Sequence, residues 1–304
     1  MASKVVEKPV CLHVEKHGTN EARDIMEYTE LEAMAAKYSK RLRTIGAQNK
    51  QIKWLNDITN NKRSNPNKVY IIEGIWAHKK ALLCKVFINS TYICPELLAT
   101  TEGKELAEKY IAMAENVFIM TKKVIGKICE LENNSSGIVS ACTIRQWQLS
   151  DVKLSDSNLL VVLDGLEIPG NTGTIMRSVD GAGADGVIFC NRKIRHNHPK
   201  LIRSSQCTCF SLTIIDAGYD ELFSWLADNS FRILLLDTES QTEYHRTNYS
   251  GRIALVAGSE RYGISQRWYD IPHESTFIPM QGVSDSLNVA VATTMVVYEA
   301  MYRR

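Results

Sequence analysis

Hydrophobic and polar positions fall into blocks along the chain, and the blocks predict two α/β domains. Between residues 44 and 145, apolar runs such as 69–73, 86–89 and 137–142 have the length and β-branched content of strands. Segments with apolar residues near 3.6 spacing, such as 51–59, 104–114 and 125–131, predict helices between them. This alternation indicates a small sheet covered by helices.

The C-terminal half has longer apolar runs, typical of a buried parallel sheet. Strands are predicted at 159–164, 186–190, 211–215, 231–237, 253–257 and 276–280. Helices are predicted at 172–181, 221–229 and 287–304, with Asn171 and Ser286 as caps of the first and last. The polar stretch 146–158 separates the halves, so we expect an N-terminal extension at 1–43 with a helix at 24–43, a first domain at 44–145, a linker at 146–158 and a second domain at 159–304.

Two loops of small and polar residues follow predicted strands, at 258–263 and 281–286. In an open α/β sheet, ligands bind at the carboxyl ends of strands, where glycines let the backbone approach a ligand. The loops therefore predict a pocket for a small polar molecule, although the same residues also occur in ordinary turns.

A third glycine-rich stretch, residues 181–186, spells G-x-G-x-x-G. A dinucleotide fingerprint needs a strand before it and a helix after it, whereas here a helix precedes and a strand follows. We therefore expect a helix-to-strand turn and no NAD site.

Three sequence words carry a resemblance to a known family. They are PGNTGTIMR at 169–177, GSERYG at 258–263 and IPMQGVSDSLNVAVA from Ile278 onward. In this order they resemble the three motifs of the SpoU/TrmH branch of the SPOUT superfamily, the RNA ribose 2′-O-methyltransferases. The resemblance implies an α/β trefoil-knot domain, S-adenosylmethionine as methyl donor, and a homodimer whose active site is completed at the subunit interface.

The resemblance also assigns roles to individual residues. Donor contacts fall to Gly258, Ile278 and Leu287, with Met280 and Gly282 beside them. The catalytic group comprises Arg177, Asn171, Glu260, Ser286 and Asn288. A guanidinium is a poor base, so Arg177 is expected to orient the RNA phosphate and stabilise negative charge on oxygen, while base-like action remains an alternative.

Each assignment has a structural alternative. Gly258 could serve only a turn, Ile278 and Leu287 could be core residues, and Asn171 could act as a helix cap alone. Arg177 could pair with Asp180 one helical turn away.

The region 44–145 resembles, more loosely, the N-terminal substrate-binding domain of rRNA-directed members of the family. The likeness rests on the spacing of Asn49, Lys53, Arg63, Glu73 and Gly74. Residues 37–85 contain twelve basic side chains against two acidic ones, although the chain as a whole has a net charge of only +2. We expect Lys53 and Arg63 to contact RNA.

A second basic stretch, RHNHPKLIR, lies in the C-terminal half. His196, His198, Lys200 and Arg203 are expected to contact RNA phosphates. Zinc-type ligands are present in His196, His198, Cys207 and Cys209, but their spacing is not that of a common zinc site, so we expect no metal.

Composition adds little to this interpretation. Hydrophobic residues make up 44% and charged residues 23%, which is ordinary for a globular protein. No apolar run approaches the roughly 20 residues of a bilayer span, and no signal peptide is recognised, so we expect a cytoplasmic protein. The eight cysteines form no C-x-x-C pair and are expected to be free thiols.

The resulting hypothesis is S-adenosylmethionine-dependent 2′-O-methylation of a ribose in 23S rRNA, either as housekeeping modification or as antibiotic resistance. The alternatives are a tRNA ribose methyltransferase and a non-catalytic RNA-binding protein that keeps the fold. A small-molecule methyltransferase fits poorly with the basic N-terminal domain.

Overall fold

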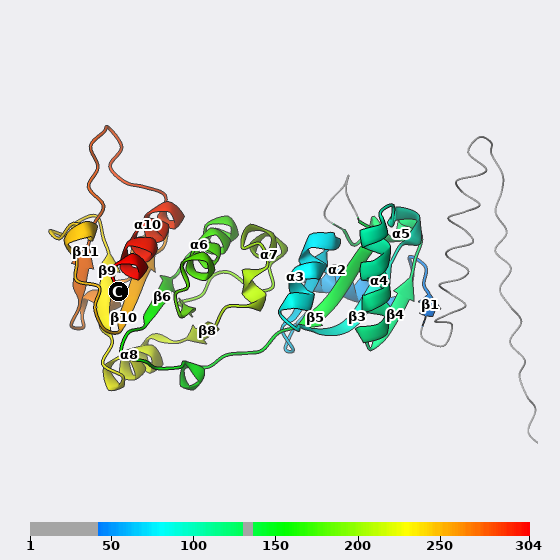
Figure 1. Ribbon diagram of the computed structural model, residues 1–304, viewed down its shortest axis with the longest axis horizontal. Coiled ribbons are helices and arrows are strands. Elements are labelled where there is room, and N and C mark those ends of the chain that lie inside the picture. Colours follow the sequence, from blue (N-terminus) through cyan, green and yellow to red (C-terminus); the bar gives the residue numbers. More distant parts are fainter. Residues whose placement is uncertain (1–41, 130–135) are drawn as a thin grey trace, which may run out of the picture. The chain divides into compact units, whose positions relative to one another are not determined.

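The computed structural model describes residues 42–129 and 136–304, which form two sheets, each with its own helices (Figure 1). The helix predicted at 24–43 lies almost wholly outside the described residues. Its last two positions belong instead to strand β1 (Leu42–Thr44), so the prediction is wrong there. Within the described residues, no helix has the length and apolar character needed to cross a membrane.

The first sheet has five strands in the order β1-β4-β3-β5-β2. After β1 come β2 (Val69–Glu73), β3 (Phe87–Ile93), β4 (Asn116–Ile119) and β5 (Ile138–Thr143). Its helices are α2 (Lys50–Thr59), α3 (Gly74–Leu83), α4 (Thr101–Met113) and α5 (Lys122–Ile125). The helix predicted at 125–131 is wrong over 126–129, because α5 ends at Ile125 and a turn follows, and its last two positions lie outside the described residues.

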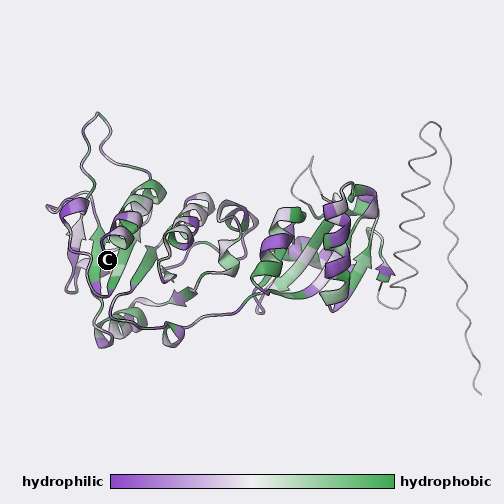
Figure 2. Cartoon of the chain, viewed as in Figure 1, coloured by the Kyte–Doolittle hydropathy of each residue, from purple (hydrophilic) through white to green (hydrophobic). Residues whose placement is uncertain are grey.

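Apolar side chains fill the interior of this first domain. Figure 2 colours its strands and helices by the hydropathy of each residue. Tyr92 on β3 stacks on Phe118 of β4 with ring centroids 5.1 Å apart, and both rings are buried. The Tyr92 hydroxyl donates a hydrogen bond to Gln51 Oε1 over 3.1 Å, so the start of α2 is tied to the same core.

The second sheet has six parallel strands in the order β11-β9-β10-β6-β7-β8. These are β6 (Leu159–Asp164), β7 (Gly186–Cys190), β8 (Ile214–Ala217), β9 (Arg232–Leu236), β10 (Ile253–Gly258) and β11 (Glu274–Thr276). The helices are α6 (Pro169–Ala182), α7 (Pro199–Ser204), α8 (Tyr219–Asp228), α9 (Gln266–Tyr269) and α10 (Val289–Tyr302). The predicted combination of a smaller α/β domain and a second domain with a parallel sheet is confirmed, while the knot stays a prediction.

Strand register sets the level at which the loops of the second domain begin. Gly258, the last residue of β10, pairs with Asp164 of β6, and Asp164 pairs with Cys190 of β7. The three loops that follow therefore leave one edge of the sheet together.

The strand predicted at 276–280 is wrong beyond its first residue. β11 ends at Thr276, and the chain continues as a loop through Pro279, whose ring nitrogen has no N–H to donate to a sheet. The strand predicted at 211–215 begins later, at Ile214, because a 3-10 helix (Thr208–Phe210) occupies the approach.

Both predicted helix caps are misplaced. α6 begins at Pro169, whose missing N–H suits the first helical position, so Asn171 lies inside the first turn. The N-cap of α10 is Asn288, whose Oδ1 accepts a hydrogen bond from Ala290 N over 3.0 Å, and Ser286 lies in the preceding loop. As expected, Gly183 ends α6 in a left-handed conformation, with a φ of 75°.

The predicted linker is partly attached to the second domain. Trp147 forms an isolated parallel bridge with Ile215 of β8, and Leu149 is buried in the second core. The first part of this stretch is therefore packed, whereas residues 153–157 are exposed.

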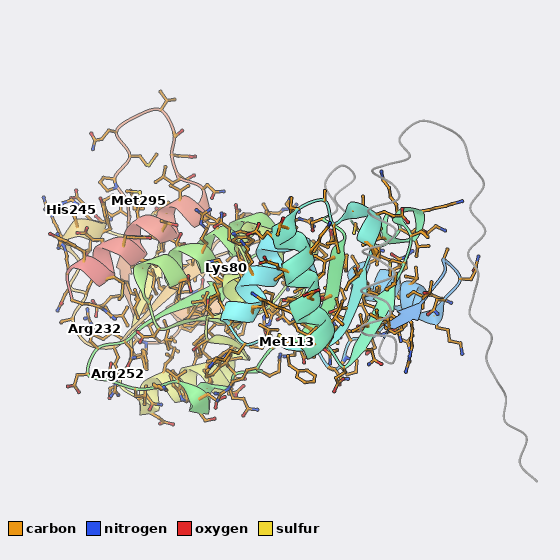
Figure 3. The ribbon with its side chains drawn as sticks, turned by 45° about the vertical axis from the view of Figure 1, so that its right-hand side comes forward. Lys80, Met113, Arg232, His245, Arg252 and Met295 are labelled. Carbon is orange, nitrogen blue, oxygen red and sulfur yellow. The ribbon has the colours of Figure 1, made fainter. Side chains whose placement is uncertain are left out.

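The amino ends of the parallel strands are held by arginines (Figure 3). Arg232, at the start of β9, forms an ion pair with Glu274 over 2.6 Å. Arg252, just before β10, donates to the Ser155 and Asn229 carbonyl oxygens over 2.7 and 2.8 Å. These cations stabilise the edge of the sheet opposite the glycine-rich loops.

Gly173 allows α6 to pack against α7. A Cβ at this position would overlap Ser204 Oγ and lie 2.7 Å from Ser205 N. We expect Gly173→Ala to destabilise the protein by about 1–3 kcal/mol and lower its melting temperature by several degrees, measured by thermal unfolding. The matched control is Gly181→Ala on the same helix, where a Cβ meets only the Tyr298 hydroxyl. The control should stay within about 1 kcal/mol of the wild type, and equal losses in both variants would contradict close packing at Gly173.

Candidate functional site

The turn at residues 258–263 depends on two glycines. A Cβ on Gly258 would lie 2.5 Å from the Gly263 carbonyl oxygen, and Gly263 has a φ of 68°. Ser259 and Gly263 exchange two backbone hydrogen bonds of 2.9 Å each. The turn is therefore tight, and its backbone stands directly at the end of β10.

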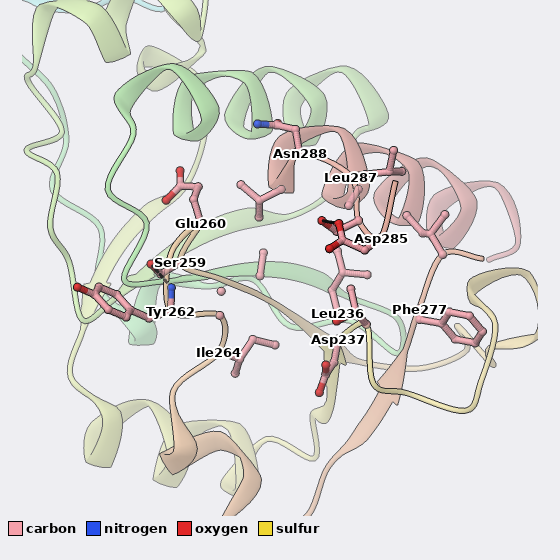
Figure 4. Close-up of a pocket in the computed structure, with 18 of the residues that line it drawn as sticks. Leu236, Asp237, Ser259, Glu260, Tyr262, Ile264, Phe277, Asp285, Leu287 and Asn288 are labelled. Atoms are coloured by element: carbon pink, nitrogen blue, oxygen red, sulfur yellow. Dashed lines mark hydrogen bonds between the residues drawn. The ribbon is translucent and has the colours of Figure 1, made fainter. Parts of the chain in front are cut away.

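A cavity of about 580 Å³ opens on one side of this turn (Figure 4). Its walls come from three segments that follow β9, β10 and β11 and from the start of α10. Of the residues assigned by sequence, the cavity is lined by Gly258, Ile278, Met280, Leu287, Glu260, Ser286 and Asn288. The volume falls in the range usual for small-molecule sites.

Hydrogen bonds join the three sequence words at the rim of the cavity. Asn171 Nδ2 donates to Glu260 Oε1 over 2.9 Å, and Asn288 Nδ2 donates to Asn171 Oδ1 over 3.2 Å. The second oxygen of Glu260 accepts from the backbone N–H of Glu167 over 3.1 Å. Asn171 itself does not line the cavity, but it holds two side chains that do.

Two aspartates, neither of which the sequence analysis selected, fix the loops around the cavity. Asp164 accepts from Ser265 N over 2.8 Å and from the Tyr219 hydroxyl over 2.6 Å. Burial, followed by the bond to Asp164, raises the pKa of Tyr219 to about 12. Tyr219 therefore stays a neutral donor at physiological pH.

Asp237 has the equivalent role after β9. It accepts from the Tyr269 hydroxyl over 2.6 Å and lines the cavity together with Tyr269. Burial is the main cause that raises the pKa of Tyr269. Both aspartates directly follow or end a buried apolar strand, so the rule that ligands meet the carboxyl ends of strands could have identified them.

Besides Asn171, two assigned residues lie outside the cavity lining. Gly282 is exposed in the loop before α10, and Arg177 is exposed on α6. Among residues 42–129 and 136–304, Arg177 makes no ion pair. Asp180 instead accepts a hydrogen bond from Ser211 Oγ over 2.8 Å.

The second basic stretch is only partly available for RNA. His196 is buried, with its Nε2 3.0 Å from Asp216 Oδ1, and His198 caps α7 by accepting from Lys200 N over 3.1 Å. Burial makes His196 unavailable to a phosphate, whereas a phosphate contact of the half-buried His198 stays a prediction. Lys200 and Arg203 are exposed.

In the first domain, Lys53 on α2 and Arg63 in the following loop are both exposed. Both side chains can therefore reach a polyanion, and their contact with RNA stays a prediction. In the part of the chain that the structure describes, no group of three or more His, Cys, Asp and Glu side chains could hold a metal ion.

Comparison with known proteins identifies the second domain. The model of the SpoU rRNA Methylase family matches residues 158–298. Residues 158–298 therefore form a SpoU methylase domain. The matched region contains all three sequence words and the whole cavity, so the resemblance suggested by the motifs is confirmed.

Relatives extend the likeness to the first domain. The chain is 22% identical over 252 residues to the Bacillus subtilis 23S rRNA (guanosine(2553)-2'-O)-methyltransferase RlmP. This match covers 83% of this chain and 96% of the relative. It is 31% identical to the Streptomyces azureus 23S rRNA (adenosine(1067)-2'-O)-methyltransferase over 146 residues, which covers 47% of this chain and 54% of the relative.

A solved structure, described as an AdoMet-bound rRNA methyltransferase from Sinorhizobium meliloti, has the same fold. Its TM-score to this chain is 0.76 at 24% identity, and the match covers 85% of this chain and 97% of that one. Together with the SpoU match, it supports an arrangement of an N-terminal domain followed by a SpoU domain.

The hydrogen bond between Asn171 and Glu260 can be tested in the SpoU domain by a double-mutant cycle. We expect Asn171→Ala and Glu260→Ala to show a coupling of about 1 kcal/mol in the free energy of unfolding, because a charged acceptor loses its donor. A control cycle pairs Glu260→Ala with Thr174→Ala, since the Thr174 hydroxyl donates to the Gly170 carbonyl oxygen of its own helix. Additive effects in the first cycle would show that the bond is not formed in solution.

Proposed function

We propose that the protein transfers a methyl group from S-adenosylmethionine to a ribose 2′-hydroxyl of 23S rRNA in the cytoplasm. The observation that carries the proposal is the hydrogen-bonded group Asn171–Glu260–Asn288 at the rim of the 580 Å³ cavity. It joins the three SpoU motifs at one place. The activities for which the rRNA methyltransferases from Bacillus subtilis and Streptomyces azureus are named supply the substrate class.

The cavity has the chemistry that the methyl donor requires. Ala257, Ile278 and Leu287 offer apolar contact to an adenine ring, and the backbone of the 258–263 turn offers N–H and carbonyl groups. The carboxylates of Asp237, Glu260 and Asp285 line the same space and complement a cationic ligand. Bound there, S-adenosylmethionine supplies a carbon activated by its sulfonium.

The residues of the chain then position the acceptor. Asn171 and Asn288 carry amide groups that can hydrogen-bond a ribose hydroxyl, and Glu260 fixes both the amide of Asn171 and the backbone at Glu167. Holding the hydroxyl near its reaction partner, in line with the bond that breaks, is expected to provide most of the rate enhancement.

We further propose that the protein acts as a homodimer. Arg177 is exposed and does not line the cavity of its own chain, which leaves it free to serve the cavity of a second copy. The neighbouring helix α10 exposes an apolar stripe at Val291, Tyr298 and Tyr302, which are 47%, 50% and 89% exposed. Helices α6 and α10 contact each other through Ser178 and Thr294, 2.6 Å apart, so one docking event would cover the stripe and deliver Arg177.

The first domain is proposed to hold the RNA. Its exposed Lys53 and Arg63, together with Lys200 and Arg203 of the SpoU domain, provide cationic contacts to phosphates. Such contacts position the RNA but do not select a sequence.

Methyl transfer itself is tested by incubating the protein with labelled S-adenosylmethionine and either rRNA or tRNA, followed by mapping of ribose methylation. We expect a 2′-O-methylated nucleotide in 23S rRNA. Donor binding without transfer to any RNA would favour the non-catalytic alternative, and label confined to tRNA would replace the substrate.

Removing the guanidinium tests the role of Arg177. We expect Arg177→Ala to lower kcat by about 10²–10³-fold, because the negative charge on the ribose 2′-oxygen and on the RNA phosphate loses the guanidinium that stabilises it. The dissociation constant of S-adenosylmethionine, measured by calorimetry, should stay unchanged. Arg177→Lys keeps the charge but not the planar geometry and should recover only part of the activity.

Mixing two inactive variants tests the dimer. If Arg177 acts across the interface, equal amounts of Arg177→Ala and Glu260→Ala subunits, exchanged to equilibrium, should recover about a quarter of wild-type activity, because half of the dimers are mixed and each has one intact site. Recovery of no activity, with mixed dimers shown to form, would mean that Arg177 acts within its own chain.

A further inference from the structure

A second cavity lies on the other side of the 258–263 turn. Its volume is about 350 Å³, and it shares Ser259, Tyr262 and Gly263 with the larger cavity. Figure 4 shows the Tyr262 ring beyond Ser259, on the side of the turn away from Leu287 and Asp237. The two hollows are therefore separated only by one tight turn.

Ribose chemistry requires two adjoining spaces. The base is attached to the sugar carbon next to the one that carries the 2′-hydroxyl. A base must therefore be seated next to the place where the hydroxyl meets the methyl donor. On the basis of the proposed function, we infer that the smaller cavity binds the base of the nucleotide to be methylated, with Tyr262 as its stacking surface.

Tyr262 is suited to stacking because its side chain is 69% exposed although it is large and aromatic. The Arg261 guanidinium lies 5.1 Å from the centre of the ring and can cover the same face of a base. Single-stranded RNA is recognised largely by unstacked bases that lie on aromatic side chains. The turn thus lies between the two cavities, and the Tyr262 ring is on the side away from Leu287 and Asp237.

The polar lining of the smaller cavity can read the edge of a base. Glu167 offers a carboxylate, Lys193 an ammonium and Asn191 an amide. A base with a carbonyl beside a ring N–H, as in guanine and uracil, satisfies an ammonium donor and a carboxylate acceptor together. Adenine has no carbonyl, and cytosine has no ring N–H on its pairing edge. The class of target is therefore guanosine or uridine.

Backbone conformation supports a fixed position for Asn191. It follows β7 with a φ of 49°, which asparagine tolerates better than most residues. Its Nδ2 lies 3.1 Å from the point where a Cβ on Gly165 would stand, so the missing side chain at Gly165 makes room for the amide. The backbone N–H of Glu167, in the same loop, donates to Glu260, which connects this cavity to the group that positions the ribose.

The decisive variants are Asn191→Gly, which keeps the left-handed backbone and removes the amide, and Lys193→Met, which keeps the length and removes the charge. Neither residue lines the larger cavity, so donor affinity by calorimetry should stay within about twofold of wild type. Each protein is assayed on four 23S rRNA transcripts that differ only in the base at the mapped methylation site. Thermal unfolding checks that the variants are folded.

We expect the wild type to prefer guanosine or uridine at the target, and each variant to lose about tenfold in kcat/KM on that transcript while discrimination among the four falls. Tyr262→Ala should lose about tenfold to a hundredfold on all four, and Tyr262→Phe should retain most activity because its ring still stacks.

Several results would overturn the inference. The first is a preference for adenosine or cytidine at the target. The second is unchanged kinetics in all variants. The third is an equal loss of kcat/KM by Asn191→Gly and Lys193→Met on all four transcripts, which would indicate phosphate contacts alone. If the wild type transfers the methyl group to RNA, the proposed function holds, even when the variants behave like the wild type. Absence of transfer by the wild type removes the proposed function and this inference with it.

Discussion

Parallel pairing of β6 with β10 is the constraint on which the site depends. Because Gly258 lies opposite Asp164, the loops after both strands begin at one level, and the helix that follows β6 starts beside the turn that follows β10. Asn171 and Glu260 are 89 positions apart in sequence but form a 2.9 Å hydrogen bond as a result. A shift of either strand by one residue would separate them and turn its buried side chains to the opposite face.

The two glycines at the ends of the 258–263 turn determine the path of the backbone at this edge of the sheet. Since Gly258 has no room for a side chain, its backbone can approach a ligand in the larger cavity. Asp164 and Asp237 then fix the neighbouring segments through buried or partly buried tyrosines, which remain protonated because burial raises their pKa. Two hydrogen bonds, from Tyr219 to Asp164 and from Tyr269 to Asp237, thus hold the segments around the cavity in place.

Local patterns predicted the strands well because a buried parallel strand leaves a continuous apolar run, as in β6 and β10. They failed where one residue overrides the pattern. Pro279 ends a β-branched run that read as a strand, and Pro169 starts α6 two residues before the expected cap. The contacts of His196 with Asp216 and of Asn171 with Glu260 join distant segments, and no spacing rule in the sequence indicates such pairs. The motif resemblance selected residues of the larger cavity, but it gave no sign of the neighbouring cavity at Asn191 and Lys193.

The two sides of the 258–263 turn separate two requirements of the proposed reaction. The donor is the same for every RNA target, so contacts to it can come from backbone that does not depend on the side chains at positions 261 and 262. The target differs between RNAs, and Arg261 and Tyr262 project from the turn without contributing to its two backbone hydrogen bonds. If the smaller cavity binds the target base, changing these side chains would alter its selectivity, while the two glycines preserve the turn. The same turn can in this way contact a methyl donor that is the same in every reaction and an acceptor nucleotide that differs between RNAs.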